Sequence, residues 1–169
     1  MDAATLRATQ APLKERFKSD PVAALITLQA RGAIDDGGIA CKLETGRGLA
    51  KAGLHPSAGG SGNDLCSGDM LLEALVACAG VTLKTVATAL ELPLTRGDVT
   101  AEGDLDVRGA LGIDKDAPVG FREIRLRFEV GTDAPQDKLD LLLKLTERYC
   151  VVYQTIKNGP KVSVSLQRV

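Results

Sequence analysis

The chain has little aromatic surface and almost no net charge. Its 169 residues include no tryptophan, three phenylalanines and two tyrosines, and 21 Lys and Arg residues balance 22 Asp and Glu residues to a formal charge of -1. Nucleic acids and anionic membranes are recognised through clustered, excess Lys and Arg, and single strands also through stacked aromatic rings. The composition therefore argues against both kinds of partner, and the core must be built from Leu, Val, Ile and Ala.

Cysteine is too sparse for a secreted disulfide scaffold. The chain has four cysteines, at Cys41, Cys66, Cys78 and Cys150, whereas disulfide-stapled domains are shorter and denser in cysteine. Residues 1–12 also lack the apolar segment of a signal peptide. We therefore expect a protein of the reducing cytoplasm, with one main domain that buries a core without covalent staples.

The longest apolar run, residues 70–90, predicts a buried helix. The run approaches membrane-spanning length, but Glu73 and Lys84 would each cost about 2.5–3.5 kcal/mol at the centre of a bilayer. Ser67 is a suitable N-cap, and Asp69 falls in the first turn, where the helix dipole favours a carboxylate. The apolar residues cover nearly the whole circumference of this helix, as is typical of a central helix buried on all sides.

The rest of the chain predicts an α+β domain with the order ββ-α-ββ-α-β. Residues 1–21 are expected to form an N-terminal helical arm, in which Pro12 ends the helix at or before Ala11. Residues 46–68 are rich in glycine and are expected to be a loop. A second long helix is expected over residues 135–158. The segments with alternating apolar residues, expected as strands, are residues 24–34, 39–44, 99–109, 121–130 and 162–166.

Cys78 and Cys150 are the strongest candidates for chemistry. Each lies on the apolar side of one of the two long helices, so the sulfurs come close if both helices pack on one sheet. Taken alone, a cysteine in such a place is most often a small apolar filler. A pair of thiols in a reducing compartment instead suits transient disulfide chemistry, in which one thiolate attacks and the other thiol resolves.

An attacking thiol must be ionised, and burial alone raises its pKa. The effect of the helix dipole fades beyond the first turn, so we expect Cys78 to need an Arg or Lys from elsewhere in the fold. The candidates are Arg31, Arg47 and Arg148. Asp69 is able to hold such an arginine through a bidentate ion pair, or it is simply a first-turn helix carboxylate.

A metal site is not expected. The spacing of Cys41, Cys66 and His55 fits no common zinc site. His55, the single histidine, lies beside a proline in a loop and is expected at the surface or in loop packing rather than as a catalytic base. Residues 59–62 are rich in glycine but lack the lysine of a phosphate-binding loop. No metal or organic cofactor is expected.

Two segments resemble the OsmC/Ohr superfamily. The stretch over residues 59–83, with Asp69 and Cys78, is similar to that family's GG...ELLLAALxxC pattern at the start of its central helix. The stretch over residues 147–153, with Cys150, is similar to its YCPVS segment. The order of the elements also fits, so the resemblance covers residues 22–169, which we expect to be one OsmC-like domain.

The resemblance implies an intertwined homodimer with a long buried central helix and active sites near the subunit interface. It also implies reduction of organic hydroperoxides in oxidative-stress defence, at the expense of an external dithiol. Cys78 then corresponds to the peroxidatic cysteine, Cys150 to the resolving one, and Asp69 to an acidic residue that helps organise the site. The family's hairpin arginine is missing, and Arg31 or Arg47 is expected to replace it. Val151 stands where the family commonly has proline.

A second hypothesis keeps the fold but not the catalysis. A non-catalytic member would bind a small ligand in an apolar cleft at the dimer seam, or would act as a redox sensor. The ligand-binding form needs no ionised thiol, so it predicts that Cys78→Ser has no effect.

Overall fold

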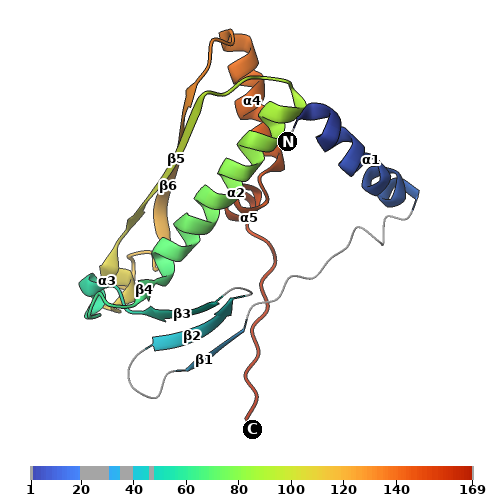
Figure 1. Cartoon of the computed structure of the whole chain (residues 1–169). Coiled ribbons are helices and arrows are strands. Elements are labelled where there is room, and N and C mark those ends of the chain that lie inside the picture. The colour runs from blue at the N-terminus through green and yellow to red at the C-terminus, as the bar shows by residue number, and fades with distance from the viewer. Residues whose placement is uncertain (1, 20–30, 35–39, 46–47, 169) are drawn as a thin grey trace.

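The long helix α2 (Ser67–Ala89) is the axis around which the other elements are arranged (Figure 1). The computed structural model describes residues 2–19, 31–34, 40–45 and 48–168. The other helices are α1 (Ala3–Ser19), the 3-10 turn η2 (Pro56–Ala58), α3 (Val107–Ala110), α4 (Gln136–Tyr149) and α5 (Val151–Asn158). The strands are β1 (Arg31–Ile34), β2 (Ala40–Thr45), β3 (Gly48–Gly53), β4 (Leu65–Cys66), β5 (Arg96–Leu105) and β6 (Phe121–Gly131).

Two sheets lie against different parts of α2. The first has the strand order β1-β2-β3-β4 and lies near the beginning of α2, while β5 and β6 form a two-stranded ribbon along its length (Figure 1). Helices α4 and α5 also contact α2, and α1 contacts it as well. The α+β class and the long central helix are therefore confirmed.

The hairpin expected near the N-terminus is confirmed where the structure describes it. Strands β1 and β2 pair in antiparallel fashion, with Ile34 opposite Cys41. Residues 24–30 and the predicted turn at 35–38 lie outside the described residues. The expected loop over residues 46–68 is wrong in part, because β3 pairs with β2 along its whole length and β4 adds a short parallel pair. Strand β3 begins and ends with glycine, so its sequence lacks the alternation of apolar residues that predicts a strand.

The predicted pairing of β5 and β6 is confirmed, and the ribbon presents its apolar side to the helices. The first strand was predicted to reach residue 109, but β5 ends at Leu105 and α3 follows it. Ile124, Leu126 and Phe128 are half-buried, whereas the residues between them on β6 are exposed. The Phe121 ring lies over Gly103 on the opposite strand, and a Cβ atom at that glycine would be 2.6 Å from the ring. This close approach needs glycine at position 103.

The core lies where α2 meets α4 and the ribbon. Its buried residues are Leu83, Val86, Ala87, Leu92 and Leu142, with Phe128 and Val130 packed against them. By length and composition alone, α2 is also able to cross a membrane, a test that core helices pass as well. Its contacts with this cluster support the predicted core position.

The expectation that α2 is buried on all sides is wrong for a single chain. One face, with Leu75 and Ala79, is buried, but Val81 on another face is 69% exposed and Leu71 is 40% exposed. The apolar residues are there, yet none of the described residues covers the side with Val81. The helix also starts one residue earlier than predicted, because the N-cap is Cys66 rather than Ser67.

Three other predictions are corrected by the structure. Pro12 lies inside α1 rather than ending it, because it occupies an exposed position where the loss of one main-chain hydrogen bond is tolerated. The expected helix over residues 135–158 is divided at Cys150 into α4 and α5. Residues 162–166 form no strand with the other described residues and extend away from the rest of the fold (Figure 1). Their apolar side chains are exposed to solvent, Val164 by 93% and Leu166 by 99%.

Candidate active site

Cys78 lies in the middle of α2, on the side that faces α5. Its side chain is half-buried and its thiol is free. The hydroxyl of Thr82, one turn further along, donates a hydrogen bond of 2.7 Å to the carbonyl oxygen of Cys78. The Thr82 side chain also contributes to lowering the pKa of the Cys78 thiol.

Cys150 lies at the break between α4 and α5 and belongs to neither helix. Its backbone is extended (φ -73°, ψ 107°), its N–H donates to the carbonyl of Thr146 at 3.0 Å, and its carbonyl accepts from Gln154 at 2.9 Å. The side-chain amide of Gln154 also donates to the carbonyl of Glu147 at 2.7 Å, which caps the last turn of α4. These bonds hold the two helices at a fixed angle around Cys150, whose side chain is only 1% exposed.

The break brings the two thiols together. Burial raises the pKa of the Cys78 thiol, but hydrogen bonding from the backbone of Val152 and Val151 and from the side chains of Cys150 and Thr82 outweighs burial and lowers its pKa below the ordinary value. Burial, together with its contact to Cys78, raises the pKa of Cys150. The first thiol is therefore the one that ionises, and the second stays protonated and donates to it.

This division of roles is what stepwise thiol chemistry requires. A thiolate is the nucleophilic form of cysteine, and a protonated thiol at hydrogen-bonding distance is placed to react with an oxidised partner. The sequence analysis expected the sulfurs of Cys78 and Cys150 to lie close together, and their roles as attacking and resolving thiols stay predictions. It missed the amides of Val151 and Val152, because it expected one continuous helix, in which these N–H groups would be bonded to carbonyls of the preceding turn.

The predicted arginine partner of Cys78 is not found in the part of the chain that the structure describes. Arg148 is exposed and stacks on the ring of Tyr149, with 5.8 Å between the guanidinium carbon and the ring centroid. Arg31 belongs to β1, but its side chain lies outside the described residues, as does Arg47 altogether. Asp69 is exposed in the first turn of α2 and makes no ion pair with any described residue, so its role as an arginine holder stays a prediction.

The remaining candidates lie away from the thiols. His55 caps the short turn η2, where its Nδ1 accepts a hydrogen bond of 3.1 Å from the N–H of Ser57, in agreement with the loop-packing interpretation. Cys66 is half-buried at the start of α2, near Gly68. The side chain of Cys41 is outside the described residues. Over the described ranges, no three His, Cys, Asp or Glu side chains are grouped as metal ligands would be.

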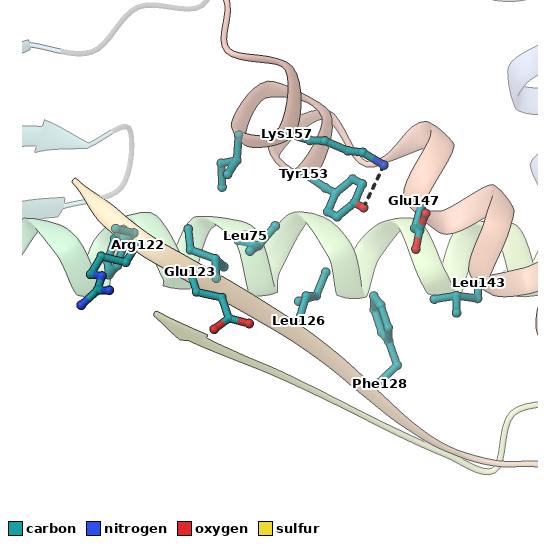
Figure 2. Close-up of a pocket in the computed structure, with 12 residues that line it drawn as sticks. Leu75, Arg122, Glu123, Leu126, Phe128, Leu143, Glu147, Tyr153 and Lys157 are labelled. Carbon is teal, nitrogen blue, oxygen red and sulfur yellow. Dashed lines mark hydrogen bonds between the residues drawn. The ribbon is translucent and has the colours of Figure 1, made fainter. Parts of the chain in front are cut away.

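A cavity of about 540 Å³ lies between β6, α2, α4 and α5, and neither Cys78 nor Cys150 is among its lining residues (Figure 2). Leu75 contributes from the turn of α2 before Cys78, and Tyr153 from the first turn of α5. The Nζ of Lys157 lies 3.4 Å from the Tyr153 hydroxyl (Figure 2). The other apolar lining residues are Phe121, Ile124, Leu126, Phe128, Leu143 and Ile156, and the other polar ones are Arg122, Glu123 and Glu147. The cavity is mostly apolar, with charged groups of both signs.

Solved structures with this fold include several with related names. An OsmC like protein from Mycoplasma pneumoniae superposes with a TM-score of 0.66 at 14% identity, over 79% of this chain and 89% of that one. An organic hydroperoxide resistance protein OsmC from Legionella pneumophila superposes with a TM-score of 0.60 at 21% identity, over 80% of this chain and 92% of that one. An organic hydroperoxide resistance protein from Elizabethkingia anophelis superposes with a TM-score of 0.62 at 16% identity, over 80% of this chain and 91% of that one.

These identities are low enough that the likeness establishes the fold and no more. No curated protein matches the chain by sequence. The sequence model of the family described as OsmC-like protein does match it, over residues 60–165, a stretch that includes α2, Cys78 and Cys150. Since that match covers more than half of the chain, and the fold agrees with it, the chain belongs to the OsmC-like protein family.

Proposed function

We propose that this protein is a thiol-dependent peroxidase that reduces organic hydroperoxides in oxidative-stress defence. The observation that carries the proposal is the contact between Cys78 and Cys150, in which the pKa of the first thiol is lowered and that of the second is raised. Membership of the OsmC-like family supports it, as do structural neighbours named organic hydroperoxide resistance proteins. We place the protein in the cytoplasm, where dithiol reductants are available.

The proposed reaction has three balanced steps. The Cys78 thiolate attacks the outer oxygen of ROOH, the O–O bond breaks, and Cys78 becomes a sulfenic acid while RO⁻ takes up a proton to form the alcohol. The Cys150 sulfur then attacks the sulfenic sulfur, which forms the disulfide and releases water. An external dithiol reduces this disulfide by thiol exchange and is itself oxidised to a disulfide. No metal or organic cofactor takes part.

The surroundings of the thiols favour an apolar peroxide. The cavity between β6, α2, α4 and α5, which Leu75 lines from the turn of α2 before Cys78, is lined mainly by aliphatic and phenyl side chains, among them Leu126 and Phe128. Small residues also flank Cys78 on α2, namely Ala74, Ala77, Ala79 and Gly80. An apolar R group is able to bury its surface there, at roughly 25 cal/mol per Å² of apolar area removed from water, whereas a large polar substrate would lose hydration without enough partners.

Mass spectrometry after exposure to a hydroperoxide tests the proposal. Protein reduced under anaerobic conditions is mixed with one equivalent of cumene hydroperoxide, and the expected product is a Cys78–Cys150 disulfide formed together with cumyl alcohol. Hydrogen peroxide serves as the comparison, and we expect it to react more slowly because it gains nothing from the apolar cavity. Absence of the bridge, with peroxide loss equal to that in buffer, would leave the non-catalytic ligand-binding hypothesis instead.

We also propose that the protein acts as an intertwined homodimer. The side of α2 with Val81 is exposed among the described residues, and so is the alternating apolar tail with Val164 and Leu166. The β5–β6 ribbon has only two strands, and such ribbons are marginal in water unless more strands or a partner extend them. A second copy is able to supply both the missing cover and additional strands.

Sedimentation equilibrium tests the dimer. Wild-type protein is expected at twice the chain mass, and the double change Val162→Asp and Val164→Asp is expected to shift it towards monomer, because charges on an interior strand are poorly tolerated. The matched control is Ser163→Asp, which lies between the two valines in the alternation. A wild-type monomer at micromolar concentration would contradict the proposal.

A further inference from the structure

Part of the wall of the cavity between β6, α2, α4 and α5 is a lysine–tyrosine pair of α5 (Figure 2). Tyr153 and Lys157 are four residues apart, a spacing that places two side chains on the same face of a helix. The Lys157 ammonium nitrogen lies 3.4 Å from the Tyr153 hydroxyl oxygen and 5.3 Å from the centroid of its ring. Two polar groups of α5 are therefore held together at the cavity.

This pair keeps hydrogen-bond donors that no other described residue uses. An ammonium group has three protons, and Lys157 donates one of them to Tyr153, whose hydroxyl still has its own proton to donate. Within the described part of the chain, Lys157 forms no ion pair and the Tyr153 hydroxyl donates to no acceptor. A single carboxylate is able to accept from both groups, and such charge-assisted hydrogen bonds are stronger than neutral ones.

The other charges at the cavity limit the kind of anion. Glu123 is already paired with Arg125, with 3.0 Å between oxygen and nitrogen. Glu147 also lines the cavity and forms no ion pair with a described residue. Arg122 lies apart from the lysine–tyrosine pair, beside Glu123 (Figure 2). A ligand with one carboxylate at Lys157 is therefore favoured, because a second acidic group would meet the like charge of Glu147.

The remaining wall suits an apolar body. It includes Leu126 and Phe128 of β6, Leu143 of α4 and Ile156 of α5. The volume of about 540 Å³ falls within the range of roughly 300–1,000 Å³ that is usual for small-molecule sites. An apolar chain or ring is able to leave water there, while its carboxylate stays at the exposed ammonium group of Lys157.

We propose that this cavity binds a monocarboxylic acid with an apolar chain or ring, whose carboxylate accepts hydrogen bonds from Lys157 and from the Tyr153 hydroxyl. The acid is a ligand and undergoes no reaction, and neither Cys78 nor Cys150 lines its site. The proposed function places the apolar part of a hydroperoxide in the same cavity, but binding of the acid requires no reactive thiol. The inference therefore goes beyond that function.

Isothermal titration calorimetry with three matched probes tests the site in the reduced, full-length protein. Octanoate carries the carboxylate and an apolar chain, octanol carries a chain of the same length without charge, and suberate carries a second carboxylate at the other end. We expect octanoate to bind about fivefold more tightly than octanol, since Lys157 is exposed and its charge is partly screened. Suberate should bind more weakly than octanoate.

Two variants locate the carboxylate. Lys157→Gln is expected to remove the preference of about fivefold for octanoate and to leave octanol within about twofold of wild type. Tyr153→Phe keeps the ring in the apolar wall and removes one donor, so octanoate should weaken by about threefold. The matched control is Lys144→Gln, which removes the same charge from an exposed position of α4 that does not line the cavity. Circular dichroism checks that all variants fold as the wild type does.

The outcomes separate this inference from the proposed function. Equal affinities for octanoate and octanol, or equal losses in Lys157→Gln and Lys144→Gln, would show that no carboxylate is held at Lys157. Absence of binding at millimolar octanoate would show that the cavity is closed to such ligands in solution, as when a second copy of the chain fills it. If octanoate binds as expected but hydroperoxide forms no Cys78–Cys150 bridge, the inference stands and the peroxidase proposal fails.

Discussion

Cys78→Ser is expected to abolish hydroperoxide reduction, with a loss of at least about a thousandfold, the order of effect that follows removal of a nucleophile in other enzymes. A serine hydroxyl in the same place stays protonated at neutral pH and cannot attack the O–O bond at a useful rate. The measurement is the consumption of cumene hydroperoxide in the presence of a dithiol, followed with a colorimetric peroxide assay.

Cys66→Ser is the matched control for this change. Cys66 is on the same stretch of chain and is half-buried like Cys78, but it lies at the start of α2, away from Cys150 and the α5 amides. Its replacement should leave turnover within about twofold of wild type, as is usual for a change outside the site. If Cys78→Ser retained turnover and Cys66→Ser lost it, the assignment of the attacking thiol would be wrong.

The elements with a strong periodic signal were predictable. Helix α2 and the β5–β6 ribbon follow from long apolar patterns with periods of 3.6 and 2, and both are present, although β5 ends at Leu105 where the pattern indicated a strand to residue 109. Strand β3 carried no such signal, since its sequence is GLAKAG and its pairing with β2 depends on backbone hydrogen bonds. The tail at residues 162–166 has the alternating pattern of a strand but pairs with none of the described strands, and the pattern of one segment does not say which strand would pair with it.

The pairing of the two thiols was also predictable, but the way in which one is activated was not. Cys78 and Cys150 each lie on the apolar side of a helical pattern, and that placement is enough to predict that their sulfur atoms lie close together. The break at Cys150 is bridged by the hydrogen bond from the Gln154 side chain to the Glu147 carbonyl, a contact that periodicity does not reveal. A search confined to cationic side chains therefore overlooked the amides of Val151 and Val152.

Cys150→Ser is expected to turn a cycling peroxidase into a single-turnover one. Cys78 still reacts with about one equivalent of peroxide per chain, but the sulfenic acid has no resolving thiol and accumulates. A stopped-flow trace should show a burst followed by little further consumption when the reductant acts only on disulfides. The sulfenic acid is then trapped with dimedone and located on Cys78 by mass spectrometry, and excess peroxide should convert it to sulfinic acid.

Comparison with Cys150→Ala separates resolution from ionisation. Both variants lack the resolving thiol, so both should stop after one turnover. A serine hydroxyl still donates a hydrogen bond to the Cys78 sulfur, whereas alanine does not, and the Cys150 thiol is one of the donors that lower the pKa of Cys78. The burst should therefore be slower in Cys150→Ala at neutral pH and approach that of Cys150→Ser as the pH rises and Cys78 becomes fully ionised. Sustained turnover in either variant would show that Cys150 is not the resolving residue, and equal burst rates at every pH would show that its thiol proton plays no part in activating Cys78.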